Sequence, residues 1–131
     1  MWVIGGYSSG ANYRNDVWYS TDGVVWTQAT ASAAFLFRYS PTSVVYDNKM
    51  WVIGGYRSID DYRNDIWYSI DGIIWTQATA SPTFPGRYNH TSVVYNNKIW
   101  VISGRGNGGY RNDVWYSLMM TDVFYDIWGL Y

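Results

Sequence analysis

The heptapeptide MWVIGGY stands at residues 1–7 and again at residues 50–56, and a third version, IWVISGR, occupies residues 99–105. The three tryptophans of this motif are at positions 2, 51 and 100, which is an interval of 49 residues both times. Copies of one sequence adopt one local structure, and each short unit buries its apolar faces by stacking against its neighbours. The repeat therefore decides the fold.

The two complete copies, residues 1–49 and 50–98, are identical at 34 of 49 aligned positions. Three differences exchange valine for isoleucine, which preserves the β-branched shape that a packed sheet requires. Most of the others fall in residues 8–12 and 33–41 and in their counterparts at 57–61 and 82–90. These windows are rich in Gly, Ser, Asn, Asp and Pro, so they are predicted to be loops around a constant frame.

A full copy contains four short strand signals, and no stretch shows a sustained helical period. The sequence thus predicts an all-β chain of four-stranded antiparallel sheets. We expect a turn at residues 47–49 and a tight hairpin at Asp71-Gly72. Grouped into units that start at residues 1, 40 and 89, the predicted strands are Trp2–Gly6, Asp16–Ser20 and Val24–Thr30 in the first unit; Thr42–Tyr46, Met50–Gly55, Asp65–Ser69 and Ile73–Thr79 in the second; and Thr91–Tyr95, Ile99–Gly104 and Asp113–Ser117 in the third.

The motif that points to a family runs from residue 87 to residue 115, across the end of the second copy and into the third. It reads Arg-Tyr-Asn-His at residues 87–90 ahead of the strand TSVVY, then IWVISG, then Asn-Asp-Val-Trp at residues 112–115. With the Gly-Gly pairs of the first two copies and a regularly spaced Tyr and Trp, this pattern resembles the Kelch repeat of galactose-oxidase-type propellers. It departs from that pattern at Ser103, which replaces a glycine, and at Pro41, which stands 49 residues before His90 at the equivalent position.

The resemblance implies β-propeller blades over residues 1–117, with a partial blade at 1–39, a full blade at 40–88 and a partial blade at 89–117. Residues 118–131 diverge from the repeat, and Val123–Trp128 could replace the missing outer strand. The first unit starts at its second strand. Propellers close with about 4–8 blades, whereas this chain supplies about two and a half, so the ring is incomplete. We therefore expect self-association or an unstable, aggregation-prone chain.

The function implied by the resemblance is non-enzymatic binding or scaffolding, with blade loops that recognise a protein or a glycan. The alternative is a truncated remnant of a larger Kelch protein without independent function. A fragment of a propeller hydrolase or oxidase is a weaker third hypothesis. The copper site of galactose oxidase uses Cys and His ligands, and this chain has no cysteine and one histidine. We therefore expect no catalytic residues, no cofactor and no metal.

Arginine and tyrosine recur in the loops, and both are enriched at binding hot spots. The repeated arginines could equally bridge blades. His90 and the aspartates at 16, 65 and 113 have structural interpretations, as packing groups and as partners of turn backbone, and the aspartates at 22 and 71 serve their turns. The candidate binding residues are Tyr7, Tyr13, Arg14, Arg38, Tyr56, Arg57, Asp60, Asp61, Tyr62, Arg63, Arg87, His90, Arg105, Tyr110 and Arg111.

Charge and hydropathy indicate which partners to exclude. The formal net charge is −1 and the 9 Lys and Arg are scattered, which disfavours a nucleic acid partner. No apolar run reaches the length of a membrane span, and the N-terminal residues lack the features of a signal peptide. The sequence leaves the cellular location open.

Overall fold

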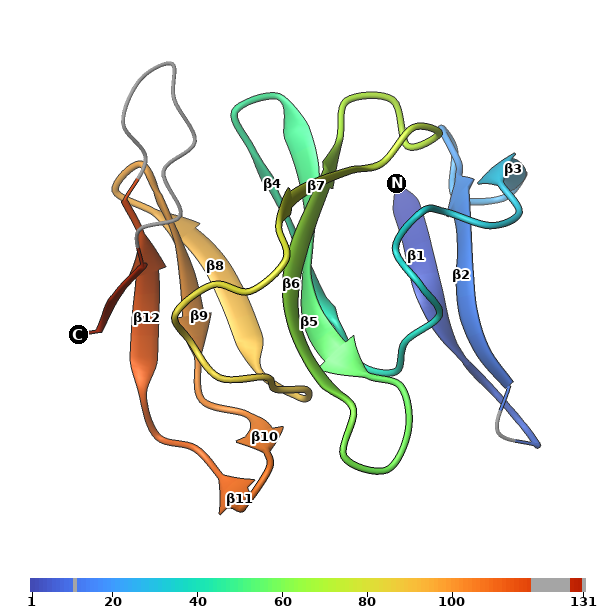
Figure 1. The fold of residues 1–131 in the computed structure, drawn as a ribbon. Coiled ribbons are helices and arrows are strands. Elements are labelled where there is room, and N and C mark those ends of the chain that lie inside the picture. Colours follow the sequence, from blue (N-terminus) through green and yellow to red (C-terminus); the bar gives the residue numbers. More distant parts are fainter. Residues whose placement is uncertain (11, 119–127, 131) are drawn as a thin grey trace.

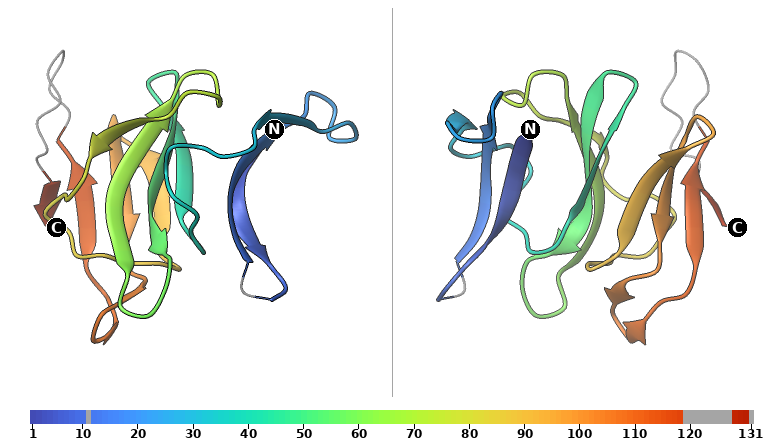
Figure 2. Two further views of the ribbon diagram at one scale, coloured as in Figure 1. Left: turned by 45° about the vertical axis from the view of Figure 1, so that its right-hand side comes forward. Right: turned by 180° about the vertical axis from the view of Figure 1, so that it is seen from behind.

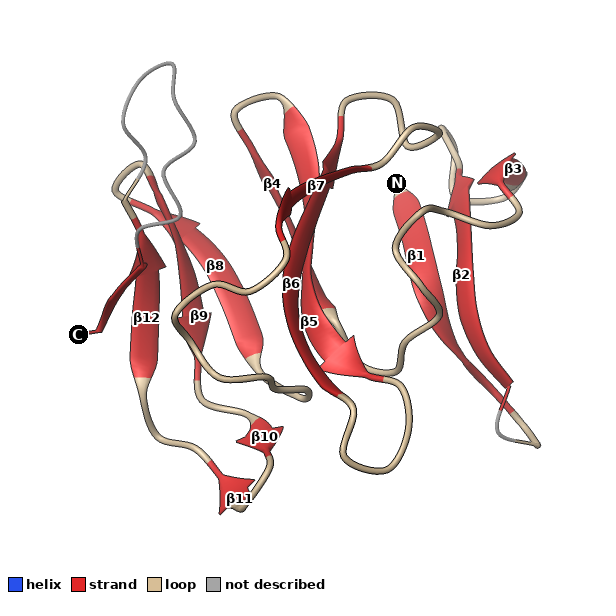
Figure 3. Ribbon diagram, in the orientation of Figure 1, coloured by secondary structure: helices blue, strands red, loops and turns tan. Residues whose placement is uncertain are grey.

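The computed structural model describes residues 1–10, 12–118 and 128–130, and its described elements are all strands (Figures 1 and 3). Three small antiparallel sheets stand face to face in chain order, as blades do (Figure 2). Blade 1 contains β1 (Trp2–Ser8), β2 (Asn12–Tyr19) and β3 (Thr27–Thr30). Blade 2 contains β4 (Thr42–Tyr46), β5 (Lys49–Tyr56), β6 (Tyr62–Ser69) and β7 (Thr76–Thr79). The all-β, blade-like prediction is confirmed.

Blade 3 contains β8 (Thr91–Tyr95), β9 (Lys98–Ile102), β12 (Val114–Ser117) and β13 (Trp128–Leu130). A separate ribbon of β10 (Arg105–Gly106) and β11 (Gly109–Tyr110) projects from its loop. β13 pairs antiparallel with β12 and is the outermost strand, the place predicted for a tail strand. Most of the predicted segment 123–128 lies outside the described residues.

The inner hairpins follow from local turn chemistry. The β4–β5 turn consists of Asp47 and Asn48, with φ of 51° and 52°, and the β8–β9 turn of Asn96 and Asn97, with φ of 48° and 56°. Two successive positive φ angles match the twist of the flanking strands, and Asn and Asp tolerate them best. The predicted turn at residues 47–49 is thus present, although Lys49 already belongs to β5.

The outer strands begin later than predicted, at Thr27 and Thr76, and the expected two-residue hairpin at Asp71-Gly72 is wrong. Residues 70–75 form a longer loop in which Asp71 Oδ1 accepts the N–H groups of residues 73 and 74 at 2.8 and 3.0 Å. The side chain thus replaces strand pairing as the backbone's partner. The conformational role predicted for this aspartate is confirmed.

Apolar side chains pack between blades rather than within them. One cluster joins blades 1 and 2 around Val17, Phe35 and Val52, and a second joins blades 2 and 3 around Ile53, Phe84 and Val101. Consecutive residues of β5 thus face opposite neighbours, because side chains alternate along a strand. This two-sided burial explains the continuous apolar run of the repeated motif.

Candidate functional site

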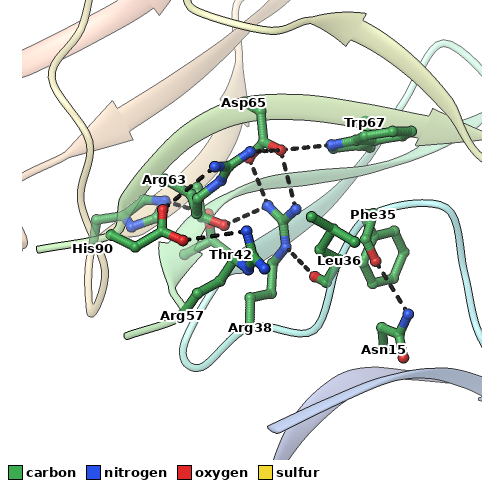
Figure 4. A network of polar contacts seen from close by, with 12 residues as sticks. Asn15, Phe35, Leu36, Arg38, Thr42, Arg57, Arg63, Asp65, Trp67 and His90 are labelled. Carbon is green, nitrogen blue, oxygen red and sulfur yellow. Dashed lines mark hydrogen bonds and ion pairs between the residues drawn. The ribbon is translucent and has the colours of Figure 1, made fainter. Parts of the chain in front are cut away.

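A buried arginine fixes the segment that leads into each inner strand (Figure 4). Arg38 is fully buried, and its Nη1 and Nη2 donate to Asp65 Oδ1 and Oδ2 at 2.7 and 3.1 Å. Nη1 also donates to the Gly54 carbonyl at 2.9 Å, and Nε to the Leu36 carbonyl at 3.1 Å. Asp65 accepts a further bond from the Trp67 indole at 2.8 Å. This arrangement satisfies a buried charge from several sides.

The repeat builds the same pair again one blade later. Arg87 donates through Nη1 and Nη2 to Asp113 Oδ1 and Oδ2 at 2.7 and 2.8 Å, and the Trp115 indole donates to Oδ2 at 2.7 Å. Hydrogen bonds from Arg87 lower the pKa of Asp113 to about 2. Burial alone would raise the pKa of Asp65, but the hydrogen bonds and charge of Arg38 outweigh it and lower that pKa.

His90 connects two blades at their inner strands. Its Nε2 lies 2.8 Å from Thr42 Oγ1, which lies 2.6 Å from Ser92 Oγ. The residue is 6% exposed, and burial, followed by the charge of Arg87, lowers its pKa to about 4. The imidazole is therefore neutral at pH 7.

These contacts place three of the candidate binding residues inside the molecule. Arg38, Arg87 and His90 are buried against protein partners, which supports the structural interpretation of each. The aspartates at 65 and 113 also differ from expectation: their described partners are arginine and tryptophan side chains. The position of each aspartate just before a strand predicts a turn role. The sequence does not show that the guanidinium of an arginine 26 or 27 residues earlier reaches the aspartate.

Five other candidates converge at the loop end of the blades. We call this surface the tyrosine basin, and it forms an open cavity of about 500 Å³. Its rings form a chain of contacts, including 5.6 Å between the centroids of Tyr7 and Tyr13 and 5.2 Å between those of Tyr56 and Tyr88. Burial, then the neighbouring phenols, raises the pKa of Tyr56. The basin is lined by Tyr7, Tyr13, Tyr39, Tyr56, Tyr62, Tyr88 and Arg105.

Tyr39 and Tyr88 are the members that sequence reasoning missed. They follow the buried arginines directly, and their backbones pair with Tyr56 and Arg105, respectively, in isolated bridges. Their rings lie 6.1 Å apart and link the tyrosines of blade 1 to those of blade 2. The sequence contained a signal for these two tyrosines, because the dipeptide Arg-Tyr occurs at the same position in both full copies.

Charged candidates surround the basin in two groups. In the β5–β6 loop, Asp61 accepts from Arg57 at 3.2 Å and from Arg63 at 3.3 Å, and Arg63 also reaches Asp65 at 3.2 Å. Asp60 stands exposed at the loop tip, with φ of 64°. The two arginines of this first group are therefore engaged in ion pairs with aspartates of their own blade.

The second group consists of Arg14, Arg105 and Arg111. In the described part of the chain no ion pair involves Arg14, Arg105 or Arg111. Arg105 and Arg111 line a second cavity of about 240 Å³ together with Tyr88 and Tyr110. Tyr88 and Arg105 belong to both cavities, so the tyrosine basin continues into a cationic corner on blade 3.

The comparisons with known proteins identify the repeat. Residues 1–127 match the family model described as the KLHDC2/KLHL20/DRC7 Kelch-repeats domain. The chain belongs to this Kelch-repeat family. Among solved structures it is similar to one titled "Structure of YjhT", with a TM-score of 0.78 and 18% identity over 98% of this chain and 47% of that one. The chain thus spans about half the length of this neighbour. No curated protein matches.

Kelch repeats form propeller modules suited to binding and scaffolding. Among residues 1–10, 12–118 and 128–130, no group of three or more His, Asp or Glu side chains could hold a metal ion. The same residues contain no helix long and apolar enough to cross a membrane.

Proposed function

We propose that this Kelch-repeat chain is a non-enzymatic recognition module and that the tyrosine basin binds an acidic segment of a partner protein. The observation that carries the proposal is the convergence of six tyrosines, from the ends of four strands and from two connecting segments, on one open cavity of about 500 Å³. A cavity of this size accommodates a few amino-acid side chains. Tyrosine offers a large rigid contact area at a low entropic cost, and a hydroxyl for hydrogen bonding.

The charge beside the basin supports an acidic ligand. Arg105 lines the basin, and Arg111 lies in the adjoining cavity. Arginine binds carboxylates through two parallel hydrogen bonds, and neither guanidinium has an ion-pair partner in the described chain. In contrast, Arg38 and Arg87 have their donors occupied by the blade itself.

The experiment is a paired screen of acidic peptides and glycans against the wild-type chain and a Tyr56→Ala/Tyr88→Ala variant. We expect an acidic peptide as the ligand and at least a tenfold loss of affinity in the variant, because both central rings are removed. Tyr95→Ala is the matched control, since Tyr95 is 71% exposed on β8, outside the basin.

Binding that survives the double substitution would refute the basin as the site. A ligand found only on the glycan array would refute the peptide assignment and establish the glycan alternative. Circular dichroism of each variant shows whether the blades remain folded, and Tyr56→Phe/Tyr88→Phe then separates loss of the hydroxyls from loss of the rings.

A further inference from the structure

Blade 1 and blade 2 carry nearly the same residues in different surroundings. Val3 is 47% exposed while its counterpart Val52 is fully buried, and Trp2 is 38% exposed against 2% for Trp51. β5 pairs on one side with β4 and on the other with β6, whereas among the described strands β1 pairs with β2 alone and lies at the edge of its sheet. The same side chains are thus buried in blade 2 and exposed in blade 1, and the edge of β1 has room for a further strand.

Asp16 adds a polar feature to this open side. Its counterparts in blades 2 and 3 each receive both terminal nitrogens of a buried arginine. Asp16 keeps the accompanying indole bond, from Trp18 Nε1 at 3.0 Å, yet no arginine contacts it within the described chain. The carboxylate is half-buried. Blade 1 therefore presents the aspartate of an ion pair, and the two equivalent pairs in blades 2 and 3 show which arginine segment would complete it.

The segments that carry Arg38 and Arg87 show what kind of segment would pair with Asp16. Each is a Phe-x-x-Arg segment, FLFR at residues 35–38 and FPGR at residues 84–87, and three residues separate it from the strand TSVVY. The phenylalanine is fully buried in both, and the guanidinium carbon of the arginine lies 5.6 or 5.5 Å from its ring centroid. The segment thus combines an aromatic anchor, a cation and a strand.

We propose that the blade 1 edge, meaning the open side of β1 together with Asp16, binds a Phe-x-x-Arg-strand segment of a separate Kelch-repeat chain. The arginine pairs with Asp16 and the carbonyl of Gly5, as Arg38 does with Asp65 and Gly54. The strand adds antiparallel to β1, with its threonine opposite Ile4 and its first valine opposite Trp2, by analogy with the β4–β5 register. Burial of the exposed apolar groups accompanies the pairing.

A second copy of this chain is a poor donor of that segment. Its two segments are already held by Asp65 and Asp113 in blades 2 and 3, and their phenylalanines are fully buried in the blade interfaces. To release one, the copy must break a buried two-pronged ion pair and open a core cluster. A separate chain with an unengaged segment does not incur that cost.

The test uses the full 131-residue protein and a fluorescently labelled peptide with the sequence of residues 81–95, SPTFPGRYNHTSVVY. Fluorescence anisotropy measures binding, and light scattering of the same sample gives the oligomeric mass. We expect a saturable 1:1 complex. The peptide with Arg87→Gln should bind at least tenfold more weakly, because it leaves the carboxylate of Asp16 without its cation.

The reciprocal change on the protein is Asp16→Asn, which keeps an acceptor for the Trp18 indole and should weaken binding to a similar extent. Asp60→Asn is the control for the same loss of charge at an exposed loop position. Equal affinity of the two peptides overturns the proposal, as does the absence of binding to monomeric protein. A stable dimer that excludes the peptide also overturns it, and assigns the edge to a second copy instead.

Discussion

Acidification from pH 7 to pH 5 should destabilise this protein through a single residue, His90. The pKa of His90 is about 4 in the folded chain against 6.5 for an unperturbed histidine, because the imidazole is buried and faces the charge of Arg87. Between pH 6.5 and pH 4 His90 is mostly protonated in the unfolded chain and mostly neutral in the folded chain. Stability is therefore undiminished above pH 6.5 and falls as the pH drops toward 4.

The magnitude follows from the separation of the two pKa values. One pKa unit corresponds to about 1.4 kcal/mol, so the free energy of unfolding should fall by about 2 kcal/mol at pH 5 and about 3 kcal/mol at pH 4. The chain has only one histidine. Side-chain carboxylates begin to protonate mainly below pH 5, so the interval from pH 6.5 to 5 isolates His90.

Urea denaturation at half-unit pH steps measures the effect, and a His90→Gln variant provides the control because its stability should stay level from pH 7 to 5. In parallel, the lone histidine gives a single Cε1 proton signal whose shift with pH can be followed by proton NMR. A native pKa near 6.5, or an unchanged slope in the variant, would refute the reasoning.

Two further predictions rest on comparisons that the repeat provides. Arg38→Ala should cost about 3–5 kcal/mol of unfolding free energy in urea denaturation, because Asp65 is 1% exposed and would lose its two-pronged ion pair, keeping only Arg63 as a charged partner at 3.2 Å. Arg87→Ala should cost less, since the side chain of its aspartate is 23% exposed, and the reverse order would contradict the burial argument. Gly72→Ala should lower the melting temperature more than Gly23→Ala, although both glycines have φ near +80°. A Cβ at residue 72 overlaps a tryptophan ring of β1, whereas a Cβ at residue 23 meets only the end of a methionine side chain at 3.9 Å. Equal decreases in melting temperature would mean that backbone strain alone matters.

The candidate site was only partly predictable from the sequence. The recurrence of Arg and Tyr at fixed positions selected Tyr7, Tyr13, Tyr56 and Tyr62, all of which line the basin. It could not separate them from Arg38, which the structure buries against an aspartate 27 residues further along the chain. A one-dimensional pattern records that a residue recurs, but the side on which it meets a partner depends on how successive blades stack.

The sequence by itself determined the all-β fold, the number of repeated units and the chemistry of the inner turns, because strand alternation, the 49-residue interval and Asn or Asp at left-handed positions are local properties. Only the tertiary structure decided burial, ion pairing and the tyrosine basin. Trp2 and Trp51 have the same sequence context but exposed fractions of 38% and 2%. The physical reason is that a blade's faces and edges are covered by its neighbours, so the environment of a residue depends on what stands beside its blade.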